Sequence, residues 1–216
     1  AMMVFNFLTS HIQPKDMKEL IISPNSSFEW LIKKIENEID FAKKNLPSGI
    51  WIKCNAIVDS KLIEKLYEAS NAGVKINLFV RGICCLKPNV KGLSENIIVK
   101  SIIGRFLEHG RIYVFANGGE FQSIKNDVYI SSADMMPRNL YTRVEAYVPL
   151  KNETVRSQIL TQVIPALIND TKNSWLLEQT GEYVKLEDKL NFCSHSYFME
   201  NPSLSGQGTL SKFKTA

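Results

Sequence analysis

The sequence is poor in cysteine and contains no long apolar run. Its four cysteines show neither a C-x-x-C motif nor a Cys/His ligand spacing, so we expect reduced thiols and no metal bound to them. No apolar stretch approaches the roughly 20 residues of a membrane-spanning helix. Residues 1–5 lack the charged and apolar regions of a signal peptide. These absences predict a cytoplasmic protein. Peripheral association with a membrane surface stays open.

A strong charge imbalance is also missing. The formal net charge of +4 over 216 residues is too small to require nucleic acid, and we expect no nucleic-acid partner. It is compatible with a polyanionic substrate that is drawn to a local positive patch. With 44% hydrophobic residues, the chain can bury a substantial core. We expect one domain at residues 1–188 and a loosely ordered tail at residues 189–216, where Pro, Gly and Ser are frequent.

Helices and strands alternate in the first part of the chain. Apolar residues at helical spacing predict a helix at residues 27–45, and Ser26 and Glu29 have the spacing of a capping box at its start. A strand, a helix and a second strand are predicted next, at residues 50–56, 60–72 and 74–80. This order favours an α/β fold with parallel strands joined by a right-handed crossover.

The pattern beyond residue 81 predicts a loop and further strands. Segment 82–96 has no clear periodicity, so we expect a long loop beyond the carboxyl end of a strand, where ligands usually bind in open α/β sheets. More strands are predicted at residues 97–101, 111–116, 128–131, 143–148 and 183–186. A helix is predicted at residues 153–169, and Pro165 is expected to kink or shorten it.

One region of the sequence concentrates groups that suit phosphate chemistry. Two arginines and a histidine precede one predicted strand, and two serines and an aspartate end the next: Arg105, His109, Arg111, Ser131, Ser132 and Asp134. Imidazole can exchange a proton or a phosphoryl group, and guanidinium groups bind phosphate oxygens through paired hydrogen bonds. The sequence therefore predicts a phosphate-handling site.

The distribution of arginine supports the same interpretation. Only six of the 26 basic residues are arginines, and five of the six fall within a single stretch: Arg81, Arg105, Arg111, Arg138 and Arg143. A single arginine at a strand end is explained equally well by a side chain that reaches from the core to water and pairs with a surface carboxylate. Five that cluster beside a histidine favour phosphate binding.

Four motifs resemble the carboxyl-terminal part of polyphosphate kinase, the family that works through a phosphohistidine. They are V-R-G-I-C-C-L at residues 80–86, G-L-S-E-N at 92–96, G-R-F-L-E-H at 104–109 and S-S-A-D-M-M-P-R-N-L at 131–140. The resemblance begins near residue 4, continues to about residue 148 and weakens through the last predicted helix. It implies one half of a phospholipase-D-like module, a mixed β-sheet flanked by helices.

The resemblance also implies a reaction. Members of this family move the terminal phosphate of ATP reversibly onto polyphosphate with magnesium, and their full-length enzymes are expected to be homo-oligomers. The phosphorylated histidine lies in the preceding half of the module, so the partners implied for this chain are ATP or ADP, polyphosphate and the upstream domains. The magnesium ligands are expected outside this chain. An isolated fragment is expected to be inactive.

The resemblance assigns residues one by one. The family's nucleotide-binding arginine falls on Arg81, and its second active-site histidine falls on His109. We expect Arg81 to bind phosphate oxygens and His109 to act as the catalytic residue that contacts the transferring phosphate or protonates the leaving group. Weaker candidates for the same ATP and phosphate pocket are Arg105, Arg111, Ser132 and Arg138. No residue is assigned to a metal.

Two features leave alternatives open. Phospholipase-D-like enzymes place a lysine two residues after the histidine, whereas this chain has Arg111, which can stabilise charge but cannot readily give up a proton. Glu108 is expected to point away from His109, and His195 is placed in the tail, so neither is assigned a role. The rival functions are a phosphodiesterase or nuclease completed by homodimerisation and a noncatalytic nucleotide-binding module.

Overall fold

The structure is a computed structural model, which describes residues 9, 19–187 and 191–201. Its strands form one mixed sheet in the order β1-β7-β6-β5-β2-β3-β4-β8-β9. The strands are β1 (Ile21–Ser23), β2 (Gly49–Cys54), β3 (Lys75–Val80), β4 (Ile97–Ile102), β5 (Arg111–Phe115), β6 (Asp127–Ser131), β7 (Glu145–Pro149), β8 (Ser174–Leu177) and β9 (Tyr183–Lys185). The helices are α2 (Ser27–Lys43), α3 (Ser60–Asn71), α4 (Pro137–Tyr141), α5 (Glu153–Gln158), the π-helix η1 (Ile159–Val163), α6 (Ile164–Asn169) and α7 (Ser194–Glu200).

The centre of the sheet follows the predicted β-α-β order. Strand β2 pairs in parallel with β3, and β3 pairs in parallel with β4. Strand β5 runs antiparallel to β2, and β6 runs antiparallel to β5. The carboxyl ends of β2, β3, β4 and β6 therefore meet the amino end of β5 at one edge of the sheet. The expectation of a mixed sheet flanked by helices is confirmed.

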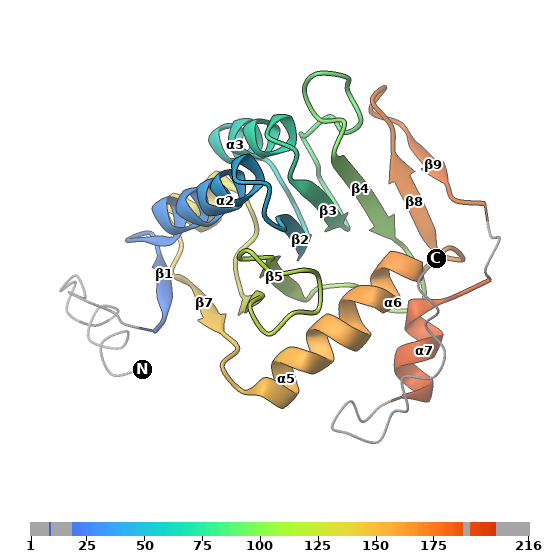
Figure 1. The fold of residues 1–216 in the computed structure, drawn as a ribbon. Coiled ribbons are helices and arrows are strands. Elements are labelled where there is room, and N and C mark those ends of the chain that lie inside the picture. Colours follow the sequence, from blue (N-terminus) through green and yellow to red (C-terminus); the bar gives the residue numbers. More distant parts are fainter. Residues whose placement is uncertain (1–8, 10–18, 188–190, 202–216) are drawn as a thin grey trace.

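Alternating side chains separate the two faces of the sheet. On β2, Ile50 and Ile52 belong to a core cluster with α2 and α3, whereas Trp51 belongs to a second cluster with η1 and α6. Figure 1 shows α2 and α3 on one side of the sheet and the run from α5 to α6 on the other. Both faces are covered, which explains why β2 is buried along its whole length.

Two local predictions need correction. Ser26 does not form the predicted capping box, because its hydroxyl makes no capping bond to the first turn of α2 and instead donates to the carbonyl of Ile22 at 3.4 Å. The predicted helix at residues 153–169 is divided by the π-helical turn η1. Pro165 lies just beyond this turn and lacks the N–H that a regular helix would use, so an interruption was expected, although not its π-helical form.

The domain boundary predicted at residue 188 stays a prediction. Residues 189–190 and 202–216 of the predicted tail lie outside the described residues, but Ser194–Glu200 within it forms α7, and Figure 1 places α7 beside α6. His195 is buried, and the Asp170 carboxylate accepts hydrogen bonds from both the N–H and the hydroxyl of Ser194. Such buried contacts bind this segment to the domain. Within the described part of the chain, no helix is long and apolar enough to cross a membrane.

Candidate functional site

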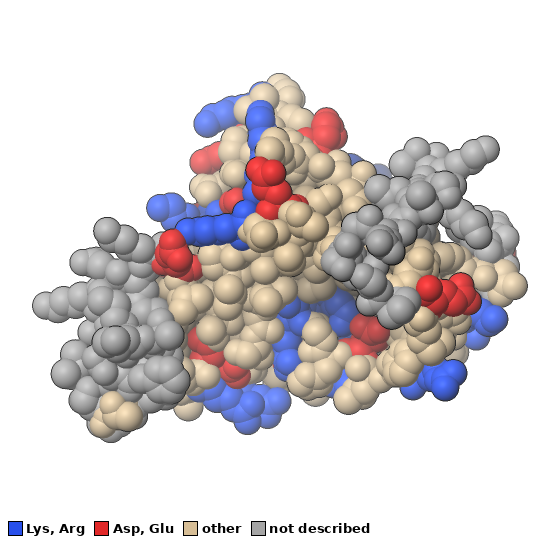
Figure 2. Space-filling model, turned by 90° about the horizontal axis from the view of Figure 1, so that it is seen from below, with Lys and Arg blue, Asp and Glu red and all other residues tan. Residues whose placement is uncertain are grey.

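The predicted site residues lie around the edge where the central strands end, together with Asn55, which was not predicted. Arg81 follows β3, Asn55 follows β2, Ser132 and Asp134 follow β6, and Arg111 begins β5. Loop 103–110, which carries His109, connects β4 to β5 and so returns to the same edge. Figure 2 views the molecule from below Figure 1, the side toward which β2, β3 and β4 point, and shows basic side chains next to acidic ones near the middle of that face. Topology therefore brings together groups that are far apart in the sequence.

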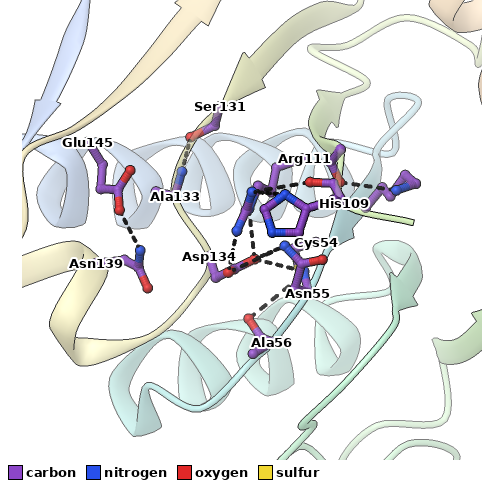
Figure 3. A network of polar contacts seen from close by, with 12 residues as sticks. Cys54, Asn55, Ala56, His109, Arg111, Ser131, Ala133, Asp134, Asn139 and Glu145 are labelled. Atoms are coloured by element: carbon purple, nitrogen blue, oxygen red, sulfur yellow. Dashed lines mark hydrogen bonds and ion pairs between the residues drawn. The ribbon is translucent and has the colours of Figure 1, made fainter. Parts of the chain in front are cut away.

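A hydrogen-bonded network joins Asp134, Arg111 and His109. The Arg111 guanidinium binds Asp134 through two hydrogen bonds, from Nε to Oδ1 at 3.1 Å and from Nη2 to Oδ2 at 2.9 Å. Its remaining nitrogen, Nη1, lies 3.0 Å from Nδ1 of His109 and also donates to the His109 carbonyl at 3.1 Å. Figure 3 shows the guanidinium between the carboxylate and the imidazole. One planar cation thus holds the histidine against a fixed carboxylate.

The arginine determines which nitrogen of His109 carries the proton. A guanidinium has donors only, so the Nδ1 atom that faces it must accept. A neutral His109 ring therefore carries its proton on Nε2. The His109 side chain is exposed, so this Nε2–H is accessible to a ligand. In this neutral form the ring can offer a hydrogen bond to a phosphate oxygen, whereas donation of a proton would first require protonation of Nδ1 and loss of its contact with Arg111.

Asp134 is buried and held in its charged form. Burial alone would raise the pKa of this carboxyl, but hydrogen bonds from the Arg111 guanidinium and from Asn55 outweigh it and keep the pKa below the ordinary 3.8. Asn55 donates to Oδ1 through its backbone N–H at 2.7 Å and its side-chain amide at 3.1 Å. The hydrogen bond from Arg111 to Asp134 is in turn the largest cause of a raised Arg111 pKa. Asp134 is thus a fixed anchor for Arg111.

We expect Asp134→Asn to destabilise the fold. Because the Asp134 and Arg111 side chains are only 7% and 13% exposed, removing one charge of the pair should lower the free energy of unfolding by about 3 kcal/mol at pH 7. A carboxyl with a lowered folded pKa contributes stability that is present above its unfolded value of 3.8 and is lost as the pH falls through the folded value. The difference between wild type and variant should therefore shrink below about pH 4, as measured by urea unfolding across pH.

Asp127→Asn is the matched control for this prediction. Asp127 pairs with Lys34 but is 31% exposed, and such partly exposed pairs contribute about 0 to 1 kcal/mol. Equal destabilisation by both substitutions at pH 7 would contradict the anchoring role of Asp134.

Arg81 lies in a different part of the same edge. It is half-buried and lines a small pocket with Lys53, Phe79 and Glu108. The Lys53 ammonium lies 2.8 Å from a Glu108 oxygen and donates to the carbonyl of Gly110 at 3.1 Å. Glu108 thus lines the pocket that contains Arg81, while its neighbour His109 contacts Arg111. The expected convergence of Arg81 and His109 on one phosphate chain stays a prediction.

The three weaker candidates have different surroundings. Arg105 is exposed, with its guanidinium carbon 5.9 Å from the centre of the Phe106 ring. Arg138 is exposed on α4. The hydroxyl of Ser132 accepts a hydrogen bond from the Ala146 N–H at 3.1 Å and so supports the pairing of β6 and β7. Of the predicted site residues, His109 and Arg111 are therefore the pair whose side chains contact each other directly.

Three residues of this edge were not predicted from the sequence: Glu108, Lys53 and His195. Glu108 bridges the other two, because its second carboxylate oxygen lies 2.7 Å from Nε2 of His195. The charged Lys53 within an otherwise apolar strand was the available signal, since a buried lysine needs a partner. No local pattern connects it to residues so distant in sequence.

The fold and the site together define an α/β domain in which basic side chains, several of them paired with carboxylates, gather at one edge of a mixed sheet. The family described as polyphosphate kinase C-terminal domain 2 matches residues 20–194. The chain is 50% identical over 209 residues to a polyphosphate kinase of Erythrobacter litoralis and 44% identical over 182 residues to that of Synechocystis, covering 96% and 84% of the chain. This chain belongs to the family of polyphosphate kinase C-terminal domains.

A solved structure agrees with the assignment. The crystal structure of polyphosphate kinase from Porphyromonas gingivalis superposes with a TM-score of 0.86 at 32% identity, covering 93% of this chain and 30% of that chain. The matches cover 29% of the Erythrobacter protein and 24% of the Synechocystis protein. The chain therefore corresponds to a carboxyl-terminal part of these relatives.

Proposed function

We propose that this chain forms one wall of the active site of a polyphosphate kinase, which transfers the terminal phosphate of ATP reversibly to polyphosphate. In this proposal the phosphorylated histidine belongs to an upstream half of the enzyme, and the isolated chain is inactive. Family membership over residues 20–194 supports the reaction. The single geometric observation that carries the proposal is the Arg111 bridge between the buried Asp134 and the exposed His109.

His109 is the catalytic residue of this wall. With Nδ1 turned to Arg111, its Nε2–H is available to the transferring phosphate or to the leaving oxygen. A hydrogen bond from Nε2–H to an oxygen that gains charge contributes on the order of 10² to 10³ in rate. Proton donation to the leaving oxygen, on the order of 10² to 10⁴, requires the doubly protonated ring, in which Nδ1 no longer accepts from Arg111. Arg111 adds a fixed positive charge next to the ring, so it stabilises developing negative charge without titrating.

Arg81 binds phosphate oxygens of the nucleotide. Its half-buried side chain lies beside a small pocket in which Lys53 is already paired with Glu108, so in this proposal the phosphate meets the Arg81 guanidinium at the open edge and not inside the pocket. Arg105 and Arg138 are exposed and belong to the outer part of the same ATP and polyphosphate path. Ser132 is a peripheral contributor, because its hydroxyl already accepts from Ala146.

Magnesium belongs to this proposal with ligands outside the chain. The acidic groups of this edge do not fit a metal, because Asp134 is bound by Arg111 and Asn55, and Glu108 contacts Lys53 and His195. No cluster of three metal-ligating side chains occurs among the described residues. We therefore assign no catalytic step of this chain to the ion. A cytoplasmic location, binding to the upstream domains and homo-oligomerisation of the full-length enzyme complete the proposal.

Phosphate labelling tests the proposed reaction. The full-length protein, incubated with ATP labelled in its terminal phosphate, should carry acid-labile phosphate on an upstream histidine and should lengthen added polyphosphate. Mass spectrometry of the labelled peptides locates the phosphate. Labelled phosphate on His109 would reverse the roles assigned to the two halves. In a separate assay, cleavage of a phosphodiester by the 216-residue chain alone would favour a homodimeric phosphodiesterase.

A further inference from the structure

His195 is a buried polar residue that the proposed reaction does not use. Its side chain is 1% exposed, although it lies on the last described helix, far from the site in sequence. The backbone N–H of Phe106 donates to its Nδ1 at 3.2 Å, and its Nε2 lies 2.7 Å from Oε1 of Glu108. Both ring nitrogens therefore face loop 103–110, the loop that carries His109.

The contacts define the proton arrangement of the ring. Nδ1 accepts a hydrogen bond from a backbone donor, so it carries no proton, and a short contact between Nε2 and a carboxylate requires the proton on Nε2. The distance is that of an ion pair, although the contact is not aligned as a hydrogen bond, and Nε2 has no hydrogen-bond partner among the described residues. Glu108 is thus bound from two sides, by the His195 imidazole at one oxygen and by the Lys53 ammonium at the other.

These contacts hold the loop at every second residue: Phe106, Glu108 and Gly110. His195 binds the backbone at Phe106 and the side chain of Glu108, and Lys53 binds Glu108 together with the carbonyl of Gly110. His109 lies between the last two. Peptide units are planar and rigid and are joined at their Cα atoms. When residues 108 and 110 are held, the backbone of residue 109 between them therefore has little freedom.

The base of this support is itself rigid. The Asp170 carboxylate accepts from Ser194, directly before His195, and also from Asn173 and Ser174. At the start of the loop, a Cβ added to Gly104 would lie 2.7 Å from Nδ1 of His195, so the loop passes close against the ring. Helix α7 is therefore held by Asp170 at Ser194 and by close packing of the loop against the His195 ring.

We propose that Glu108 and His195 are positioning residues that place His109 for phosphoryl transfer, which makes helix α7 part of the active-site support. This inference rests on the proposed function. Glu108 and His195 act through the loop and do not touch the reacting atoms. Displacing a catalytic group by about 1 Å can lower a rate by about 100-fold, so loss of this support should reduce turnover more than substrate binding.

Substitutions at His195 in the full-length protein test the inference. His195→Phe removes both contacts and should lower kcat for polyphosphate synthesis by about 10- to 100-fold, with the KM for ATP changed by less than about threefold. In His195→Gln the amide nitrogen can replace Nε2 and reach Glu108, whereas in His195→Asn the amide oxygen can replace Nδ1 and accept from Phe106. Because Glu108 is the direct neighbour of His109, we expect His195→Gln to recover more of kcat than His195→Asn.

The controls separate positioning from stability. Met199→Ala changes an exposed residue of the same helix and should leave kcat unchanged. Turnover is divided by the folded fraction measured by circular dichroism, so a substitution that only destabilises the fold leaves kcat per folded molecule unchanged. If His195→Phe does not fold, the order of His195→Gln and His195→Asn together with a loss in Glu108→Gln decides the question.

The outcomes distinguish this inference from the proposed function. If the unmodified full-length protein makes no polyphosphate, the proposed function fails and this inference fails with it. If the unmodified protein is active and the folded His195 variants keep its kcat, or if Gln and Asn are equivalent at position 195, only the positioning role is overturned. A loss of kcat that Gln partly restores supports it.

Discussion

His109→Ala in the full-length protein should lower kcat for polyphosphate synthesis by about 10² to 10⁴. The exposed imidazole makes its side-chain contact with Arg111, which remains bound to Asp134 when the ring is removed. The fold should therefore be retained, and the thermal unfolding midpoint should change little. Steady-state kinetics with varied ATP gives kcat and KM separately.

His109→Gln is the matched variant for this prediction. Its amide can donate a hydrogen bond from the position of Nε2 but cannot transfer a proton. We expect His109→Gln to bind ATP like wild type and to share most of the loss in kcat if His109 acts as an acid. Recovery of full turnover by Gln would assign His109 a hydrogen-bonding role alone, and unchanged turnover in His109→Ala would remove it from the site.

Arg81→Ala should have the second largest effect. A charge-assisted hydrogen bond to a phosphate contributes roughly 1.5 to 3 kcal/mol, which corresponds to a roughly 10- to 100-fold weaker interaction with ATP. Titration of a nonhydrolysable ATP analogue by calorimetry measures this loss directly. Arg156→Ala is the control, because Arg156 is the one arginine outside the segment from residue 81 to residue 143 and lies on α5, away from the edge.

Combining the two substitutions tests whether Arg81 and His109 serve one ligand. Independent sites give additive effects within about 0.5 kcal/mol, whereas groups that bind the same phosphate chain couple more strongly. We expect the double variant Arg81→Ala/His109→Ala to lose less activity than the two single losses combined. Strict additivity would separate the two residues.

Much of the sheet could be predicted because its strands are long and apolar. The predicted β2, β3, β4, β5 and β6 agree with the observed strands within one or two residues at each end. The β-α-β order also predicted correctly that β2 and β3 are parallel. Once these strands are placed, their ends bring Arg81, His109 and Arg111 to one edge, so the location of the candidate site followed from topology.

Among the short elements, β9 was predicted at residues 183–186, but β1, α4 and α7 could not be predicted in the same way. Strand β1 has three residues and helix α4 has five, which is too few for a period to be recognised. Helix α7 has seven residues and is fixed by Asp170 and by loop 103–110, contacts that no local pattern reveals. The same reason explains why Glu108 was set aside: its partners Lys53 and His195 come from opposite ends of the chain.

Strand alternation limits how Arg81 and His109 can cooperate. Arg81 follows β3 two residues after Phe79, whose side chain packs on the α6 face, whereas Arg111 precedes Tyr113, which packs on the α2 and α3 face. Side chains two residues apart in an extended segment share a face. Arg81 and the pair of His109 and Arg111 therefore approach the edge from opposite faces, and a shared ligand must cross the open edge between them.

A crystal structure of the full-length protein with a nonhydrolysable ATP analogue tests this arrangement most directly. We expect one triphosphate to cross the edge, with the Arg81 guanidinium and Nε2 of His109 each about 2.7 to 3.2 Å from its oxygens. We also expect Arg111 to keep both of its bonds to Asp134. A triphosphate that contacts only one of the two residues, or lies on the opposite edge of the sheet, would contradict the account.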